Sequence, residues 1–167
     1  TDRLPFASNL RIEIAEAAAR RLMRVQLELG GKDPVYVADD VADVAKVAPA
    51  VTDGAFYNNG QSCCAVERVY VHERIHDRFV EAFVDSVRQF VVGDPMDEKT
   101  YIGPVARPAQ LAVLEAQVAD AQAKGGRVLC GGGRLDRPGF YFAPTVVIDA
   151  THQMDLMREE TFGPLIG

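Results

Sequence analysis

The centre of the sequence is the stretch Phe56-Tyr57-Asn58-Asn59-Gly60-Gln61-Ser62-Cys63-Cys64-Ala65-Val66-Glu67-Arg68. Asn59 and Gly60 tolerate the left-handed backbone conformations that end helices, so they predict the stop of the apolar helical segment before them. The two adjacent cysteines then fall on a loop ahead of a strand rich in β-branched residues. A thiol on such a loop can be reached by a substrate, although free cysteines are commonly small buried hydrophobes. The residues alone leave both interpretations of Cys63 and Cys64 open.

The segments on either side of this loop alternate between helical and strand-like patterns. Apolar residues recur at helical spacing over four ranges, 12–21, 41–55, 75–91 and 111–121. Asp40 is expected to cap the second of these helices, and Pro49 to kink or break it. Strand-like runs occupy residues 25–29, 68–72, 127–130 and 141–148. Such alternation predicts an α/β fold, layered around a largely parallel sheet.

Charge and composition narrow the class of partner. The 167 residues include 18 basic and 24 acidic side chains, a net charge of −6 without a basic stripe, which argues against nucleic acid and anionic membranes. No apolar run reaches ~18 residues and the amino terminus lacks a secretory signal pattern, so we expect a cytoplasmic protein without a membrane span. Its three cysteines and three histidines show no metal-ligand spacing, so neither a metal site nor a disulfide framework is expected. We therefore expect a small-molecule partner.

Three motifs, in this order, resemble the aldehyde dehydrogenase superfamily. They are Leu27-Glu28-Leu29-Gly30-Gly31-Lys32-Asp33-Pro34, Gly60-Gln61-Ser62-Cys63 with its aromatic-Asn lead-in, and Glu159-Glu160-Thr161-Phe162-Gly163-Pro164. The resemblance runs from about Ala17 to the last residue. Because chains of that family are considerably longer, it implies an incomplete part of the fold. Residues 1–31 would be the tail end of a dinucleotide-binding domain, and residues 32–167 the cysteine-bearing catalytic domain without its carboxyl-terminal part.

The resemblance also implies roles for individual residues. Cys63 matches the nucleophile, Glu28 the general base and Glu160 the carboxylate that binds the nicotinamide-side ribose, with Phe162 packing near the nicotinamide. Cys64 matches only a neighbour of the nucleophile. The implied reaction oxidises a small-molecule aldehyde to a carboxylic acid with NAD or NADP, through a thiohemiacetal and a thioester on Cys63 that water activated by Glu28 hydrolyses. A thiol pKa of ~8.5 leaves little thiolate at pH 7, so Cys63 needs a base or local amide dipoles. The full-length protein is expected to be a homo-oligomer.

Each assignment has a structural alternative. Glu28 could be a solvated carboxylate on the strand predicted over residues 25–29, and Glu160 and Phe162 could be a helix-end carboxylate and a core ring. Lys32 follows two glycines, yet the rest of the phosphate-binding Gly-x-x-x-x-Gly-Lys pattern is absent. The whole chain could also be a non-catalytic or truncated module of the family without turnover. A cysteine hydrolase is a third class, for which no histidine lies in a catalytic signature.

Overall fold

The computed structural model describes residues 6–167, which belong to two compact units, Thr1–Gly30 and Gly31–Gly167. The first unit contains helix α1 (Phe6–Ala19), followed by an extended stretch without regular secondary structure. A helix predicted over residues 12–21 is thus confirmed, although it begins earlier and ends two residues sooner. Residues 1–5 of the segment assigned to a dinucleotide-binding domain lie outside the described residues, and that assignment stays a prediction.

The strand predicted over residues 25–29 is wrong. This stretch alternates apolar and polar side chains, but in the described residues it joins no sheet. Alternating apolar and polar side chains would give a strand one apolar and one polar face. The strand itself forms only when its backbone groups pair with a neighbouring strand. The first strand, β1 (Asp33–Val37), begins beyond Gly30 and Gly31 instead.

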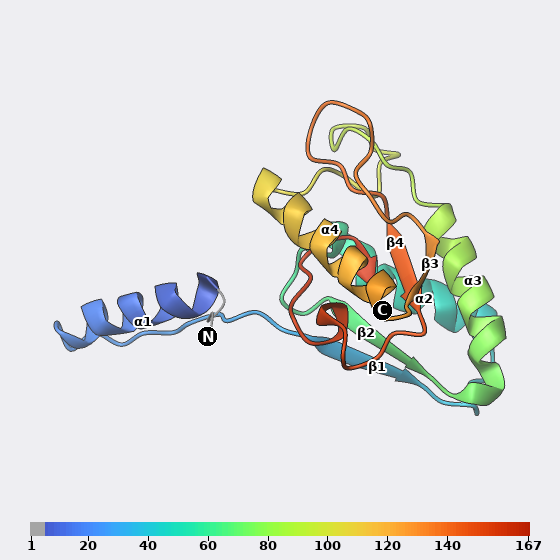
Figure 1. Ribbon diagram of the computed structural model, residues 1–167, viewed down its shortest axis with the longest axis horizontal. Helices are drawn as coiled ribbons and strands as arrows, with labels where there is room; N and C mark the ends of the chain where they lie inside the picture. The colour runs from blue at the N-terminus through green and yellow to red at the C-terminus, as the bar shows by residue number, and fades with distance from the viewer. Residues whose placement is uncertain (1–5) are drawn as a thin grey trace. The chain divides into compact units, whose positions relative to one another are not determined.

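The second unit contains all the strands of the described chain. Its helices are α2 (Val44–Phe56), α3 (His76–Arg88) and α4 (Pro108–Ala123), and its single-turn helices are η1 (Tyr57–Gly60), η2 (Glu73–Ile75) and η3 (Asp155–Met157). After β1 come β2 (Val66–Val71), β3 (Arg127–Cys130), β4 (Thr145–Ile148) and β5 (Leu165–Ile166). The elements are labelled in Figure 1.

The strand pairing is mainly parallel. β1 pairs with β2 and β4 with β5 in parallel, while β3 pairs with β4 antiparallel. Val69 N–H donates to the Gly167 carbonyl at 2.9 Å, which joins β2 to the end of β5. The prediction of a largely parallel α/β layering is therefore confirmed.

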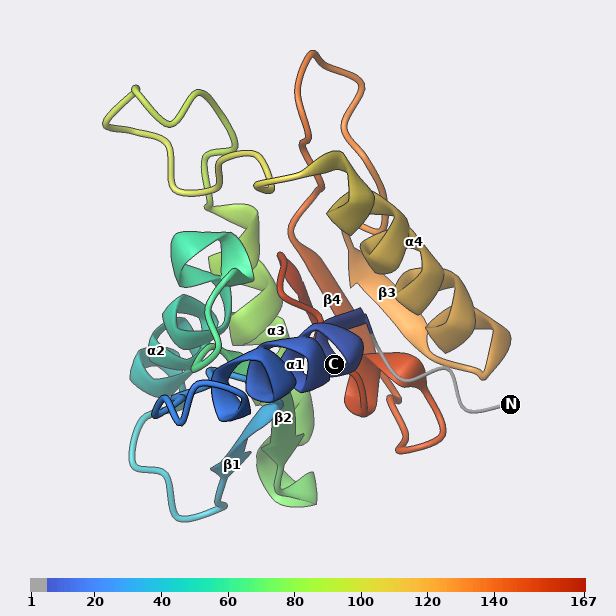
Figure 2. The ribbon, with the colours of Figure 1, turned by 90° about the vertical axis from the view of Figure 1, so that its left-hand side faces the viewer.

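Helices cover both faces of this sheet, as Figures 1 and 2 show from two directions. Successive strand residues point to opposite faces, and here they enter two different cores. Val146 and Ile166 pack with apolar side chains of α2 and α3. Val147 and Leu165 pack with those of α4 and η3. The strands in the middle are thus buried on both faces, as parallel sheets require.

The helix ends follow local chemistry. Asp43, not Asp40, caps α2: its carboxylate accepts from Ala45 N–H at 3.0 Å. Pro49 lies inside α2, which continues past it as one helix, so of the predicted kink or break the break did not occur. At the end of α4, Gly125 takes φ +96°, and Gly126 N–H donates to the Ala121 carbonyl at 2.8 Å. This is the hydrogen-bond pattern of a Schellman stop.

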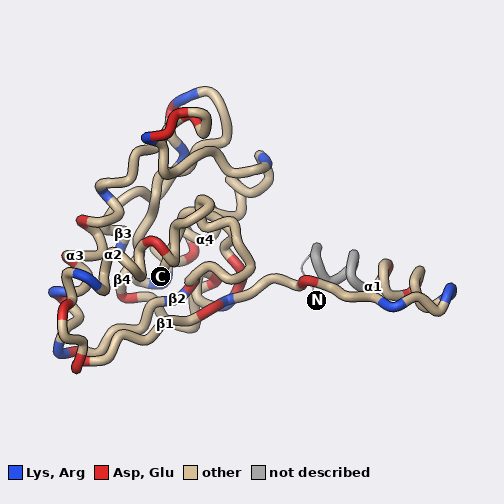
Figure 3. Tube along the Cα trace, turned by 180° about the vertical axis from the view of Figure 1, so that it is seen from behind, with Lys and Arg blue, Asp and Glu red and all other residues tan. Residues whose placement is uncertain are grey.

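The surface carries charges of both signs. Figure 3 shows acidic and basic residues distributed along α3, whose apolar side enters the core. None of the helices in the described part of the chain is both long enough and apolar enough to cross a membrane.

Candidate active site

The cysteine loop begins with three consecutive residues in the left-handed region. Asn58, Asn59 and Gly60 have φ of +49°, +64° and +67°, directly after α2 ends at Phe56. The predicted left-handed conformation at Asn59 and Gly60 is confirmed, and Asn58 shares it. Asn58 Nδ2 donates to the Gln61 carbonyl at 2.8 Å, and Gln61 Oε1 accepts from Ala106 N–H at 2.8 Å. The loop is therefore tied to itself and to the segment that precedes α4.

Both cysteines of the loop are exposed, so the interpretation as buried core residues is wrong for Cys63 and Cys64. The Cys64 sulfur lies 3.3 Å from the Ser62 hydroxyl and 3.2 Å from the Tyr57 hydroxyl. Hydrogen bonds from Ser62 and then from Tyr57 stabilise the thiolate and lower the pKa of Cys64. Cys130 differs, because it packs against the core and its burial raises the pKa of its thiol.

Two glycines bring the three sequence motifs into contact. A Cβ at Gly31 would collide with the Cys63 carbonyl oxygen, and a Cβ at Gly60 would collide with the Gly163 carbonyl oxygen. Only the absence of a side chain allows these backbones to approach so closely. The segments that begin at Gly31, Gly60 and Glu160 therefore meet at one place.

The Glu160 segment is held in an uncommon conformation. The Glu160 Oε1 atom accepts from Gly31 N–H at 2.9 Å, and Phe162, which is partly buried, has φ +47°. The adjacent Thr161 is 1% exposed. A carboxylate has about four lone-pair positions, so Glu160 can accept from ribose hydroxyls in addition to Gly31. Carboxylate oxygens are acceptors of the kind that sugar hydroxyls bind, and the role of Glu160 in coenzyme binding stays a prediction.

Glu28 lies in the first unit, on the exposed extended stretch before Gly30. The strand on which the sequence predicted it is not formed. Its pairing with Cys63 stays a prediction.

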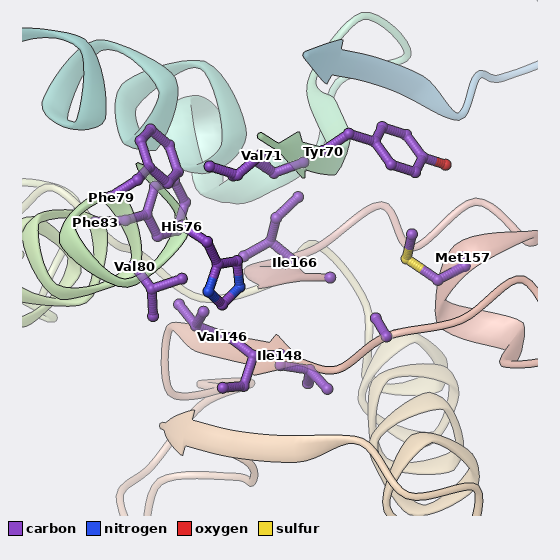
Figure 4. Close-up of a pocket in the computed structure, with 14 residues that line it drawn as sticks. Tyr70, Val71, His76, Phe79, Val80, Phe83, Val146, Ile148, Met157 and Ile166 are labelled. Atoms are coloured by element: carbon purple, nitrogen blue, oxygen red, sulfur yellow. The ribbon is translucent and has the colours of Figure 1, made fainter. Parts of the chain in front are cut away.

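An apolar cavity lies elsewhere, between α3 and the sheet. Figure 4 shows Phe79, Val80 and Phe83 of α3 facing Val146 and Ile166 across it, with the His76 ring at its side. Its lining includes neither cysteine of the loop nor any residue of the Glu160 segment. Among the described residues, no group of three or more His, Cys, Asp or Glu is arranged to hold a metal ion.

Beside the site lie Lys32, which the sequence suggested only as a rejected phosphate-binding lysine, and Glu67, to which the sequence assigned no role. Lys32 Nζ lies 2.6 Å from Glu67 Oε2, and both side chains are buried. The signal that could have revealed them is the parallel pairing of β1 and β2, since Lys32 precedes the first strand and Glu67 is the second residue of the other. That register is a property of the fold, not of either segment alone.

Comparison with known proteins agrees with this arrangement of an α/β sheet and an exposed cysteine loop. Residues 8–167 match the aldehyde dehydrogenase family. The chain belongs to that family.

Individual relatives are close in sequence and structure. An aldehyde dehydrogenase of Paenarthrobacter nicotinovorans is 43% identical over 152 residues, which cover 91% of this chain and 33% of that protein. The succinate-semialdehyde dehydrogenase [NADP(+)] of Mycobacterium leprae is 44% identical over 152 residues, with the same two coverages. A crystal structure of an E. coli NADP-dependent enzyme matches with a TM-score of 0.89 and 37% identity, over 95% of this chain and 33% of that one. The chain thus spans about a third of the length of the relatives it matches.

Proposed function

We propose that the natural protein carrying this chain oxidises a small-molecule aldehyde to a carboxylic acid with NAD or NADP. The observation that supports this most is the meeting of the exposed Cys63 loop with the Glu160 segment, through Gly31 and Gly60. The proposed nucleophile, Cys63, and the proposed ribose-binding group, Glu160, then belong to segments that both contact Gly31. The relatives support the same class, since one is named as an NADP(+)-dependent succinate-semialdehyde dehydrogenase.

In the proposed mechanism, the Cys63 thiolate attacks the aldehyde carbon and forms a thiohemiacetal. The nicotinamide, when bound, supplies the acceptor for the hydride that leaves this carbon. A thioester then remains on Cys63. Glu28 takes a proton from water, the resulting hydroxide attacks the thioester carbon, and the acid leaves as the Cys63 thiolate is regenerated. Glu160 accepts hydrogen bonds from ribose hydroxyls, and Phe162 packs near the nicotinamide.

Cys64 is a competing candidate for the nucleophile, because its hydroxyl partners lower the pKa of its thiol. Replacing each cysteine in turn tests which of the two is needed. We expect Cys63→Ala to abolish aldehyde oxidation in the natural enzyme, and Cys64→Ala to retain most of it. Reduction of NADP⁺ is followed by absorbance at saturating coenzyme. Succinate semialdehyde is the first substrate to test because a relative is named for it. Loss confined to Cys64→Ala would transfer the nucleophile to Cys64, and two fully active variants would refute the mechanism.

We further expect a cytoplasmic homo-oligomer, in which residues 1–31 complete a dinucleotide-binding domain and residues 32–167 belong to the catalytic domain. These assignments follow from membership of the family and remain predictions.

A further inference from the structure

The pair formed by Lys32 and Glu67 is a buried ion pair at the junction of three segments. Lys32 Nζ lies 2.6 Å from Glu67 Oε2, and the side chains are 11% and 5% exposed. Removing two charges from water is costly unless further hydrogen bonds satisfy them. Glu67 meets this condition, since its carboxylate also accepts from Thr161 N–H at 2.8 Å and from Phe162 N–H at 3.0 Å.

A β-bulge directs Glu67 into this position. Asp33 is paired with Val66, whereas the next residue, Pro34, is paired with Arg68, so Glu67 is the extra residue of β2. A bulge re-aims a side chain relative to a regular strand, and Pro34 has no N–H to offer to the ladder at that point. The interruption of the ladder is therefore what allows the Glu67 carboxylate to reach the backbone of Thr161.

The backbone that Glu67 holds is strained. Phe162 has φ +47°, a conformation that residues with a Cβ rarely adopt and that persists only where the surroundings enforce it. Two consecutive N–H groups at this point are bound by one carboxylate. The Thr161 hydroxyl accepts from Lys32 Nζ and donates to Gln117 Oε1, both at 2.9 Å. The backbone N–H and the hydroxyl of Thr161 are thus both bound to the ion pair, while its carbonyl accepts from Gln110 Nε2 at 2.7 Å.

Glu160 is consequently held from two sides. Its carboxylate accepts from Gly31 N–H, next to Lys32, and its backbone continues into the peptide that Glu67 binds. We propose that Lys32 and Glu67 are a positioning pair for the coenzyme, which fixes the direction of the Glu160 carboxylate and the place of the Phe162 ring. This inference rests on the proposed function, in which Glu160 and Phe162 contact the coenzyme. Neither Lys32 nor Glu67 touches the coenzyme itself.

The test is Glu67→Gln in the natural enzyme. Glutamine has nearly the same shape, but its amide cannot accept from Lys32 and from two backbone N–H groups together. We expect the KM for NADP⁺ to rise at least ~10-fold while kcat at saturating coenzyme falls less than ~3-fold. A second assay follows hydrolysis of p-nitrophenyl acetate, which in the proposed mechanism would use the Cys63 thiol but no coenzyme. This rate should stay within ~2-fold of the wild-type value, whereas general damage to the fold would lower it together with kcat.

Glu115→Gln is the matched control. It removes an ion pair to Arg134 whose side chains are exposed and which shares no hydrogen bond with Lys32 or Glu67. We expect an unchanged KM for NADP⁺. Because Glu67→Gln leaves the Lys32 charge buried, a second variant, Lys32→Met with Glu67→Gln, removes both charges and should show the same rise in KM.

The results separate this inference from the proposed function. If the wild-type enzyme neither oxidises aldehydes nor hydrolyses the ester through Cys63, the proposed function is wrong. If the wild type is active and both Glu67 variants keep a wild-type KM for NADP⁺, the positioning pair is refuted while the function stands. A parallel loss of ester hydrolysis and coenzyme affinity also refutes it, because the pair would then support the fold as a whole.

Discussion

Gly31 approaches the Cys63 carbonyl so closely that its α-hydrogen occupies the only space available. We expect Gly31→Ala to lower the free energy of unfolding by about 1–3 kcal/mol, because the added methyl group forces two backbones apart. The free energy is measured by urea denaturation of the 167-residue chain.

The matched control for this substitution is Gly133→Ala. A Cβ at Gly133 would meet no atom within 4 Å. Its stability should be unchanged or raised by up to ~1 kcal/mol, since alanine reduces the conformational entropy of the unfolded chain. Equal stability of the Gly31 and Gly133 variants would contradict the close approach.

The two kinds of cysteine environment predict a difference in pH dependence. The thiolate is the reactive form, and hydrogen bonding lowers the pKa of Cys64 while burial raises that of Cys130. At a given pH below ~8.5, Cys64 therefore holds the larger thiolate fraction, and its alkylation should begin at lower pH. Iodoacetamide labelling of a Cys63→Ala variant, followed by mass spectrometry between pH 6 and 9, measures both rates. Cys130 reacting as fast as Cys64 at pH 7 would contradict this.

At the scale of elements, the residue that caps α2 differs from the one that the sequence predicted. Asp40 and Asp43 both precede the helix, but Asp43 is the capping residue, with an extended backbone and a carboxylate that accepts from Ala45 N–H. We expect Asp43→Ala to lower the free energy of unfolding by about 1 kcal/mol. Asp40→Ala, three residues earlier, is expected to change it by less than ~0.5 kcal/mol. Thermal or urea denaturation measures the free energy of unfolding of both variants. A larger loss in Asp40→Ala than in Asp43→Ala would show that Asp40 is the cap.

Helices were predicted better than strands for a physical reason. The periodicity of α3 is carried by its own residues, since it has a single apolar face to bury. In α4 the apolar residues Leu111, Leu114 and Val118 mark the buried side, which also includes Gln110 and Gln117. The strand β5 has only Leu165 and Ile166, and it exists because β4 pairs with it and Val69 of β2 binds the carbonyl of the next residue, Gly167. Residues 25–29 show the opposite error, a strand pattern without a sheet. Pairing between distant segments cannot be read from one segment.

The residues of the candidate site also differ in whether the sequence could reveal them. Cys63, Glu160 and Phe162 could be found because they lie in short motifs that resemble a family. Lys32 and Glu67 could not, because their contact depends on the register of β1 against β2 and on the bulge within it. The contact of Gly60 with the Gly163 carbonyl depends likewise on how the loops are folded together.

At the scale of the whole molecule, the 167-residue chain is expected neither to bind NADP⁺ nor to turn over an aldehyde on its own. Binding sites for such ligands bury about 70–90% of the ligand surface, and Glu160 with Phe162 offers one carboxylate and one ring. The relatives are about three times as long as the stretch this chain matches. Calorimetric titration with NADP⁺ should give no binding heat, and micromolar affinity with aldehyde-dependent reduction would show that the chain is sufficient.

The meeting of the Gly60 and Gly163 backbones also has a consequence during protein synthesis. Gly60 and Gly163 are 103 residues apart in the sequence. At ~5–20 residues per second, the ribosome delivers the second partner on the order of 5–20 s after the first. Throughout that interval Cys63 and Cys64 are already synthesised, whereas the Gly163 segment, which later packs against their loop, is not. Because Cys63 and Cys64 stay exposed in the folded chain, oxidation threatens the growing polypeptide as well as the finished protein, and a reducing environment is needed from the ribosome onward.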